Sequence, residues 1–272
     1  MEIKEPIFIL APARSGTTIF YNLFTRHKNT CFPEHFIDKY WNTPWKFRFI
    51  PIMVKQQMIR YKIRPLPHEG RFWRKFHSFS TYLDESSISL NEKKYIFSAI
   101  KAEMKAFKAE RFVDRVHDHM LQIRFLNALF PDAFYIVLSR DPRAIVNSQY
   151  TLMKKNWNLS YNKETYGDVI AKFGKGESLL DDCINYYKYY TSTMKKDLLI
   201  VKNRTIEVKY ERFVNNPSGE LKKIFSFTNL EWYDDLEDQI PDILELKNNQ
   251  KWLQLPESEK NVLQKEFRDY DY

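Results

Sequence analysis

The sequence predicts an α/β fold in which a central parallel sheet is flanked by helices. Short, continuously apolar runs alternate with longer segments whose apolar residues recur at helical spacing. This alternation is typical of parallel strands joined by crossover helices. The unbroken apolar character of the runs indicates strands that are buried on both faces. A length of 272 residues with 43% hydrophobic residues suits one domain over residues 1–272 with a sizeable core.

The expected elements follow one another in the order of such a fold. We expect strands at residues 7–10, 30–32, 111–114, 134–138 and 205–209. We expect helices at residues 17–27, from residue 50 onward, and at 91–110, 121–130, 142–153, 178–194 and 217–227. Asn91 can cap its helix, and Pro142 suits a first turn. Three of the six glycines lie within residues 166–176, where we expect a mobile loop or lid.

The net charge of +8 arises mainly in one segment. Residues 45–75 contain nine Lys and Arg but a single acid, Glu69. A nucleic-acid binder usually presents a broader basic face or a recognisable module, so we expect no nucleic-acid partner. A local basic patch fits an anionic ligand or membrane headgroups better. The stretch 46–64 is basic and amphipathic, and is therefore a candidate for peripheral membrane contact.

Cysteine content and hydropathy indicate the cellular compartment of the protein. Cys31 and Cys183 are too few for a disulfide framework, which favours a reducing environment. No apolar run approaches the roughly 20 residues that span a bilayer. The first apolar stretch, residues 6–13, is too short for a signal peptide. We therefore expect a cytoplasmic protein.

A candidate phosphate loop follows the first expected strand, where residues 10–18 read LAPARSGTT. A turn from a strand into a helix points unpaired backbone N–H groups and the positive helix end at one place, which favours an anion. Compared with the nucleotide-binding pattern GxxxxGK[ST], Ala11 replaces the first glycine and Thr17 replaces the lysine. The missing lysine argues against ordinary ATP or GTP chemistry. Arg14 can supply a cation instead, and Thr17 and Thr18 can donate hydroxyl groups. The alternative is a tight turn with a surface arginine.

A second candidate site follows the fourth expected strand. Arg140 lies at the carboxyl edge of the sheet, where open α/β folds bind ligands. Ser148 comes eight residues later, about two turns along the next helix. The two side chains can converge on one phosphate if the ligand lies along that helix. The alternative is that Arg140 pairs with Asp141 and that Ser148 is an exposed helical residue.

Together the two segments resemble the sulfotransferases that use 3′-phosphoadenosine-5′-phosphosulfate (PAPS). In that family an RSGTT loop holds the 5′-phosphosulfate, and an arginine and a serine eight residues apart hold the 3′-phosphate. The resemblance covers roughly residues 6–35 and 111–230, and implies a sulfotransferase fold related to that of P-loop NTPases. Tyr210, within a further family-like segment at residues 208–213, becomes a candidate nucleotide contact. The implied PAPS-binding residues are thus Arg14, Ser15, Gly16, Thr17, Thr18, Arg140, Ser148 and Tyr210.

The resemblance implies transfer of a sulfuryl group to a hydroxyl group, or with less support an amine, of a small-molecule, lipid or carbohydrate acceptor. Such in-line displacement passes through a loose transition state similar to that of phosphoryl transfer. It requires a cation near the departing oxygen and a base for the acceptor proton. Arg14 is the first candidate for that cation. The transferred group carries less charge than a phosphoryl group, so we expect no metal.

Two residues compete for the role of the base. Arg115-Val116-His117 resembles the Lys-Thr-His triplet of the phenol and steroid sulfotransferases, whose histidine is the base, and makes Arg115 a candidate second cation. Other members use a glutamate after the first helix, and Glu34 lies at the corresponding place. A histidine with a pKa of about 6.5 suits a base near neutrality, whereas a carboxylate near 4.3 needs burial to raise its pKa. We therefore favour His117 and keep Glu34 as the alternative.

The region 36–110 is outside the resemblance, and we expect it to be a helical, aromatic-rich insertion that binds the acceptor. Twelve of the 44 aromatic residues lie at 36–82. They could form the walls of an acceptor site or the core of a helical subdomain. Two other functions also fit the motifs. One is a nucleotide or sugar kinase with a degenerate phosphate loop, and the other is a non-catalytic protein that binds adenosine 3′,5′-bisphosphate.

Overall fold

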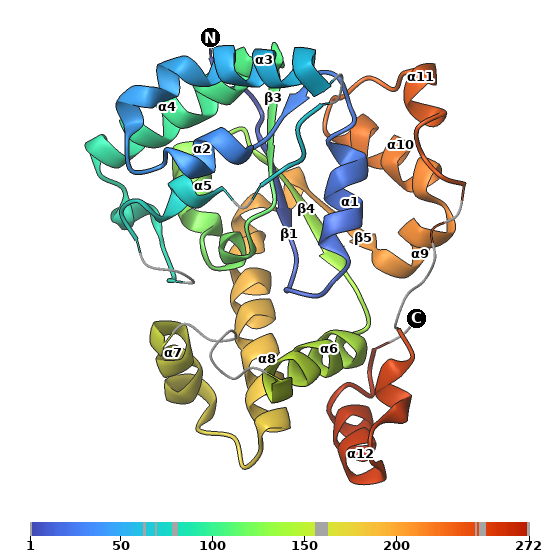
Figure 1. Ribbon diagram of the computed structural model, residues 1–272. Helices are drawn as coiled ribbons and strands as arrows, with labels where there is room; N and C mark the ends of the chain where they lie inside the picture. The colour runs from blue at the N-terminus through green and yellow to red at the C-terminus, as the bar shows by residue number, and fades with distance from the viewer. Residues whose placement is uncertain are drawn as a thin grey trace.

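The computed structural model describes residues 2–61, 64–68, 70–77, 81–155, 163–242, 244 and 249–270. A parallel sheet lies at the centre of the molecule (Figure 1). Within the described residues its strand order is β2-β3-β1-β4-β5, and every neighbouring pair is parallel. The strands are β1 (Ile7–Leu10), β2 (Thr30–Cys31), β3 (Arg111–Asp114), β4 (Phe134–Ser139) and β5 (Thr205–Lys209). The predicted central parallel sheet is confirmed.

Helices cover both faces of the sheet because side chains along each strand point alternately to opposite sides. On β1, Phe8 and Leu10 join one hydrophobic core, whereas Ile7 and Ile9 join another. The first core includes residues of α4 (Leu90–Phe107), α5 (Ile123–Leu129) and α8 (Leu179–Leu198). The second includes residues of α1 (Thr17–Phe24), α9 (Tyr210–Asn215) and α10 (Pro217–Phe227).

The remaining helices lie around this three-layer centre. They are α2 (His35–Lys39), α3 (Ile50–Tyr61), α6 (Pro142–Lys155), α7 (Lys163–Phe173), α11 (Asp234–Glu237) and α12 (Glu257–Glu266). Short 3-10 turns are η1 (Pro44–Phe49), η2 (Arg71–Arg74), η3 (Glu85–Ser87), η4 (His117–Leu121), η6 (Leu199–Arg204) and η7 (Lys251–Gln254). No helix in the described ranges is both long and apolar enough to cross a bilayer.

Two local predictions need correction. The loop expected at residues 166–176 is limited to residues 174–176, because α7 runs through Gly167 and ends at Phe173. A single glycine costs a helix only about 1 kcal/mol relative to alanine, so it does not prevent helix formation. Helix α4 is capped not by Asn91 but by Ser89, whose side chain accepts a hydrogen bond from the backbone N–H of Glu92 at 3.2 Å.

The region 36–110 is helical, as predicted, and it is continuous with the core. Phe47, Phe72, Trp73 and Tyr95 are buried in the same hydrophobic cluster as β1 and β3. Several of the aromatic residues in this region therefore stabilise the fold, which corresponds to the second interpretation of its composition.

Candidate active site

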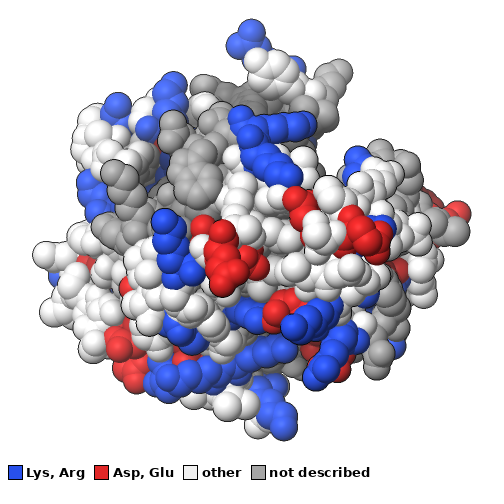
Figure 2. All heavy atoms as spheres, turned by 90° about the horizontal axis from the view of Figure 1, so that it is seen from below, with Lys and Arg blue, Asp and Glu red and all other residues white. Residues whose placement is uncertain are grey.

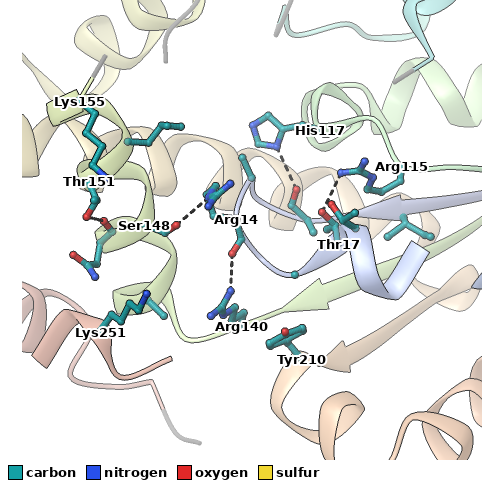
Figure 3. A pocket seen from close by; sticks show the side chains of 18 residues that line it. Arg14, Thr17, Arg115, His117, Arg140, Ser148, Thr151, Lys155, Tyr210 and Lys251 are labelled. Carbon is teal, nitrogen blue, oxygen red and sulfur yellow. Dashed lines mark hydrogen bonds between the residues drawn. The ribbon is translucent and has the colours of Figure 1, made fainter. Parts of the chain in front are cut away.

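A cavity of about 660 Å³ lies where the strands end at the carboxyl edge of the sheet (Figure 3). Arg14 follows β1, Arg115 follows β3, Arg140 follows β4 and Tyr210 follows β5, and all four line the cavity. Parallel strands end at the same edge, so residues far apart in the chain meet there. The other lining residues include Gly16, Thr17, Thr18, His117, Asn147, Ser148, Thr151, Lys155 and Lys251.

The phosphate loop forms the turn between β1 and α1. Arg14 and Gly16 both have positive φ angles, of 75° and 80°. The Ser15 hydroxyl is buried and has no hydrogen-bond partner among the described residues. Helix α1 begins directly afterwards at Thr17, so the unpaired N–H groups of its first turn lie beside the cavity. The local backbone thus has the strand-to-helix turn that the sequence predicted, and the binding of an anion there stays a prediction.

Gly16 is required by both its backbone and its neighbour. A Cβ atom at this position would lie 2.2 Å from Cε2 of the Tyr210 ring. We expect Gly16→Ala to lower the free energy of unfolding by roughly 1–3 kcal/mol from the left-handed backbone alone, with the clash adding to this. Thermal unfolding with and without adenosine 3′,5′-bisphosphate measures the effect, and nucleotide stabilisation should be lost. Gly167→Ala is the control, because a Cβ there meets no atom within 4 Å. Equal melting temperatures for the two variants would contradict the prediction.

The two predicted phosphate-binding segments are in direct contact. Nε of Arg14 donates a hydrogen bond to Oγ of Ser148 at 2.9 Å. Nη1 of Arg140 donates to the backbone carbonyl of Arg14 at 2.8 Å. Both bonds are drawn in Figure 3, where the loop, the end of β4 and helix α6 meet around the cavity. The segments that resemble the two halves of a PAPS site therefore line one cavity.

Arg140 is held by side chains that the sequence analysis did not identify. Arg140 as a whole is 8% exposed, and its guanidinium carbon lies 4.9 Å from the centroid of the Tyr210 ring. Nε donates to Asn249 at 2.7 Å, and the Asn249 amide donates in turn to Glu211 at 2.9 Å. Burial lowers the pKa of Arg140. These contacts fix the direction of the guanidinium, which leads us to regard Asn249 and Glu211 as positioning residues.

His117 lies at the start of η4 with its ring aimed into the cavity (Figure 3). Its Nδ1 is 3.2 Å from the carbonyl oxygen of Ala11. A carbonyl only accepts, so Nδ1 carries the hydrogen and the lone pair of the neutral ring is at Nε2. Nε2 is buried and has no partner among the described residues. Burial also lowers the pKa of His117, which keeps the ring neutral. The Tyr190 ring stacks on it at 4.3 Å and restricts its orientation.

Arg115 and Thr17 connect the histidine segment to the phosphate loop. Nη1 of Arg115 donates to the Thr17 hydroxyl at 3.2 Å. The backbone N–H of Arg115 donates to the Asp114 carboxylate at 2.7 Å, and this bond fixes the chain where it leaves β3. The guanidinium also lies 5.6 Å from the centroid of the Tyr21 ring. Arg115 is thus a second arginine beside the loop, on the side opposite Ser148.

The sulfotransferase family model matches residues 6–235. The chain belongs to the sulfotransferase family. It is 22% identical over 264 residues to an omega-hydroxy-beta-dihydromenaquinone-9 sulfotransferase of Mycobacterium tuberculosis (strain CDC 1551 / Oshkosh), covering 83% of this chain and 63% of that protein. It is 26% identical over 111 residues to the protein-tyrosine sulfotransferase 2 of Gallus gallus, covering 40% of this chain and 26% of that protein. The chain thus spans less than two thirds of the length of these relatives.

Solved structures confirm the predicted sulfotransferase fold. A sulfotransferase of Mycobacterium avium superposes with a TM-score of 0.62 at 15% identity, covering 99% of this chain and 76% of that one. The sulfotransferase domain from the curacin biosynthetic pathway gives a TM-score of 0.56 at 16% identity, covering 100% and 99% of the two chains. At these identities the likeness concerns the fold.

This sulfotransferase family member has further cations around its cavity. Five of the described lining residues are Lys or Arg and none is acidic; Lys155 and Lys251 were not predicted. Asn147, Thr151 and Lys155 recur every four residues on α6, a helical spacing that could have indicated them. Lys251 lies in a short turn without a periodic pattern.

The face that includes α6, α7 and α12 shows a band of Lys and Arg with fewer acids between them (Figure 2). The cavity is therefore suited to a polyanion.

Glu34 has a different environment. It caps α2 by accepting hydrogen bonds from the backbone N–H groups of Phe36 at 2.7 Å and Ile37 at 3.1 Å. Its own N–H donates to Glu103 at 3.3 Å, and it is not among the residues that line the cavity. Burial raises the pKa of the Glu34 carboxyl to about 7. The structure thus gathers Arg14, Arg115 and His117 around the cavity, whereas Glu34 is at the N-terminus of α2 and outside the lining residues.

Proposed function

We propose that this protein transfers a sulfuryl group from PAPS to a hydroxyl group of an acceptor. The observation that carries the proposal is the contact between Arg14 and Ser148, which unites both family nucleotide motifs in one cavity. PAPS bears negative charge at its 5′-phosphosulfate and at its 3′-phosphate. A cavity lined by five cations and by no described acid fits such a ligand.

The proposed arrangement assigns each end of PAPS to one motif. The backbone N–H groups and hydroxyls of Ser15, Gly16, Thr17 and Thr18 would hold the phosphosulfate, as helix N-termini hold anions. Arg140 and Ser148 would hold the 3′-phosphate, and the Tyr210 ring supports both Gly16 and Arg140. The unpartnered Ser15 hydroxyl supports this fit, since a buried donor without a partner is costly.

The proposed chemistry divides the remaining roles between three residues. Bound PAPS would supply an activated sulfuryl group with a good leaving group. His117 would accept the proton of the acceptor hydroxyl at Nε2, while its Nδ1–H remains held by Ala11. Arg14 and Arg115 would stabilise the negative charge that develops on the departing oxygen.

The proposed acceptor is a hydroxylated small molecule, lipid or carbohydrate, and an amine is the alternative acceptor group. A lipid receives support from the first relative, whose name describes a hydroxylated menaquinone derivative. The region 36–110 is our candidate for the acceptor side, because its η2 turn contacts the end of β3 through a hydrogen bond from the Trp73 indole to Asp114. A cytoplasmic location is also part of the proposal and suits the two buried cysteines, which are not joined in a disulfide.

Transfer of labelled sulfate from PAPS to a panel of sterols, phenols, hydroxylated lipids and oligosaccharides tests this function. We expect a sulfated product without added ATP. Phosphorylation of an acceptor that depends on Mg-ATP would instead indicate a kinase. Tight binding of adenosine 3′,5′-bisphosphate without transfer to any acceptor would indicate a non-catalytic binder.

Arg140 allows the nucleotide assignment to be tested without an acceptor. We expect Arg140→Ala to weaken binding of adenosine 3′,5′-bisphosphate by roughly 10–100-fold, the value of a hydrogen bond to a charged group. Binding of adenosine 5′-phosphate, which lacks the 3′-phosphate, should change far less. Isothermal titration with both nucleotides measures the difference, and Arg212→Ala on an exposed face of α9 is the matched control. An equal loss for both nucleotides would show that Arg140 does not select the 3′-phosphate.

A further inference from the structure

The outer side of η1 and α3 exposes large apolar side chains next to cations. Trp45, Ile52 and Ile59 are 59%, 56% and 68% exposed. Arg48, Lys55 and Arg60 are exposed beside them. We call these six residues the α3 face. In Figure 1, α3 lies at the top of the molecule, away from α6 and α12 at the bottom.

Helix α3 has apolar residues on its buried side and also on its exposed side. Ile50 and Val54 are fully buried on the side that packs against α4. Ile52, Lys55 and Ile59 recur at i, i+3 and i+7, so they form a stripe on the opposite side of the helix. The inward residues explain why α3 folds onto the protein. More than half of the surface of Ile52 and of Ile59 lies outside that packing, which indicates that the stripe contacts something else.

The charge around this stripe has one sign. Residues 39–68 contain seven Lys and Arg and no Asp or Glu. The side chain of Arg64 is not part of this surface charge, because it donates a hydrogen bond to the backbone carbonyl of His27 at 2.8 Å. Arg48 lies 5.7 Å from the centroid of the Trp45 ring, and Arg60 lies 5.3 Å from that of Tyr61. The cations and the aromatic rings thus occupy the same surface.

We propose that the α3 face docks on the surface of an anionic lipid bilayer. Trp45, Ile52 and Ile59 would enter the headgroup layer, while Arg48, Lys55 and Arg60 would contact lipid phosphates. Interfacial helices combine apolar residues and cations in this way, and tryptophan is favoured at headgroup level. A second copy fits less well, because pairing two such faces would oppose like charges. Nucleic acid fits less well, because exposed isoleucines flank Lys55 on its stripe. This inference does not depend on sulfuryl transfer.

Vesicle flotation of the full chain tests the docking surface. We expect binding to vesicles of phosphatidylcholine mixed with phosphatidylglycerol and little binding to phosphatidylcholine alone. Tryptophan fluorescence should shift to the blue on binding and be quenched by brominated lipids, and Trp45→Phe should remove most of this response. The double change Lys55→Glu with Arg60→Glu should weaken binding about tenfold or more, since each cation near an anionic surface contributes substantially. Ile52→Ser with Ile59→Ser should have a comparable effect.

Matched controls exist elsewhere on the surface. Lys195→Glu with Lys196→Glu on α8, and Leu199→Ser in η6, change exposed residues of the same types outside the α3 face. These variants should bind the vesicles as the unaltered protein does. Equal binding to neutral vesicles, or equal losses in the control variants, would overturn the proposal. So would dimerisation that the α3-face variants abolish, or tight binding to an RNA oligonucleotide in place of vesicles.

Discussion

Replacing His117 with alanine should lower kcat by roughly 10²–10⁴-fold, the usual contribution of a general base. The physical reason is the single free lone pair at Nε2, which the Ala11 carbonyl enforces by holding hydrogen at Nδ1. Affinity for adenosine 3′,5′-bisphosphate should change little, because the phosphates are assigned to other residues. Turnover with saturating PAPS, together with nucleotide titration, measures both quantities.

The pH dependence gives this prediction a second readout. Burial lowers the pKa of His117, so the ring stays neutral and able to accept a proton below the ordinary histidine value of about 6.5. Activity should be retained as pH falls to that value and be lost only as pH passes through the lowered pKa. The free energy of unfolding should also decrease as pH falls through this range. Below about pH 6.5 the unfolded chain binds the proton more readily than the folded one, so the folded state loses stability as pH falls. The His117→Ala variant should lack both effects.

Glu34→Gln is the companion variant. Glutamine keeps a carbonyl oxygen that can accept from the N–H groups of Phe36 and Ile37, so the α2 cap should survive. We expect this variant to retain most of its turnover. A Glu34→Gln variant that folds normally but loses turnover, beside an active His117→Ala variant, would transfer the role of the base to Glu34.

The sequence was sufficient for the sheet and for the residues at its edge, because parallel strands leave local signals and share an edge. Strand β1 and most of β4 are continuously apolar, and each is followed within a few residues by a polar side chain, Arg14 after β1 and Arg140 after β4. The other side chains around the cavity could not be predicted from local sequence patterns. Asn249 and Lys251 come from a segment with no periodic pattern, and only the folded chain brings them to Arg140 and to the cavity.

Glu34 combines a motif match with a helix-capping position. Its position after the first helix suggested catalysis, but the same position precedes a short helix whose first N–H groups need an acceptor. Acidic residues are suited to that capping role. Sequence alone could not weigh the two roles, because the difference depends on how far α2 lies from the cavity.

Removal of the Arg14 side chain should also have a large effect. We expect Arg14→Ala to lower kcat by about 10²–10³-fold, as loss of one transition-state donor does in other enzymes. Arg14 is an exposed residue that lines the cavity, and its described side-chain hydrogen bond goes to Ser148, so the side chain contributes little to the core. Turnover measured beside thermal unfolding separates the two contributions. Equal loss of turnover and stability would make Arg14 a structural residue.

The backbone at Arg14 offers a control that distinguishes the guanidinium from the turn. Its φ angle of 75° is unfavourable for any residue with a Cβ and is accessible to glycine. Arg14→Gly should therefore be more stable than Arg14→Ala by about 1–2 kcal/mol, because the left-handed conformation no longer costs this amount. Both variants lack the cation, so both should be equally slow in turnover. If the glycine variant instead recovered activity together with its stability, the geometry of the loop, rather than the charge of Arg14, would be what the reaction requires.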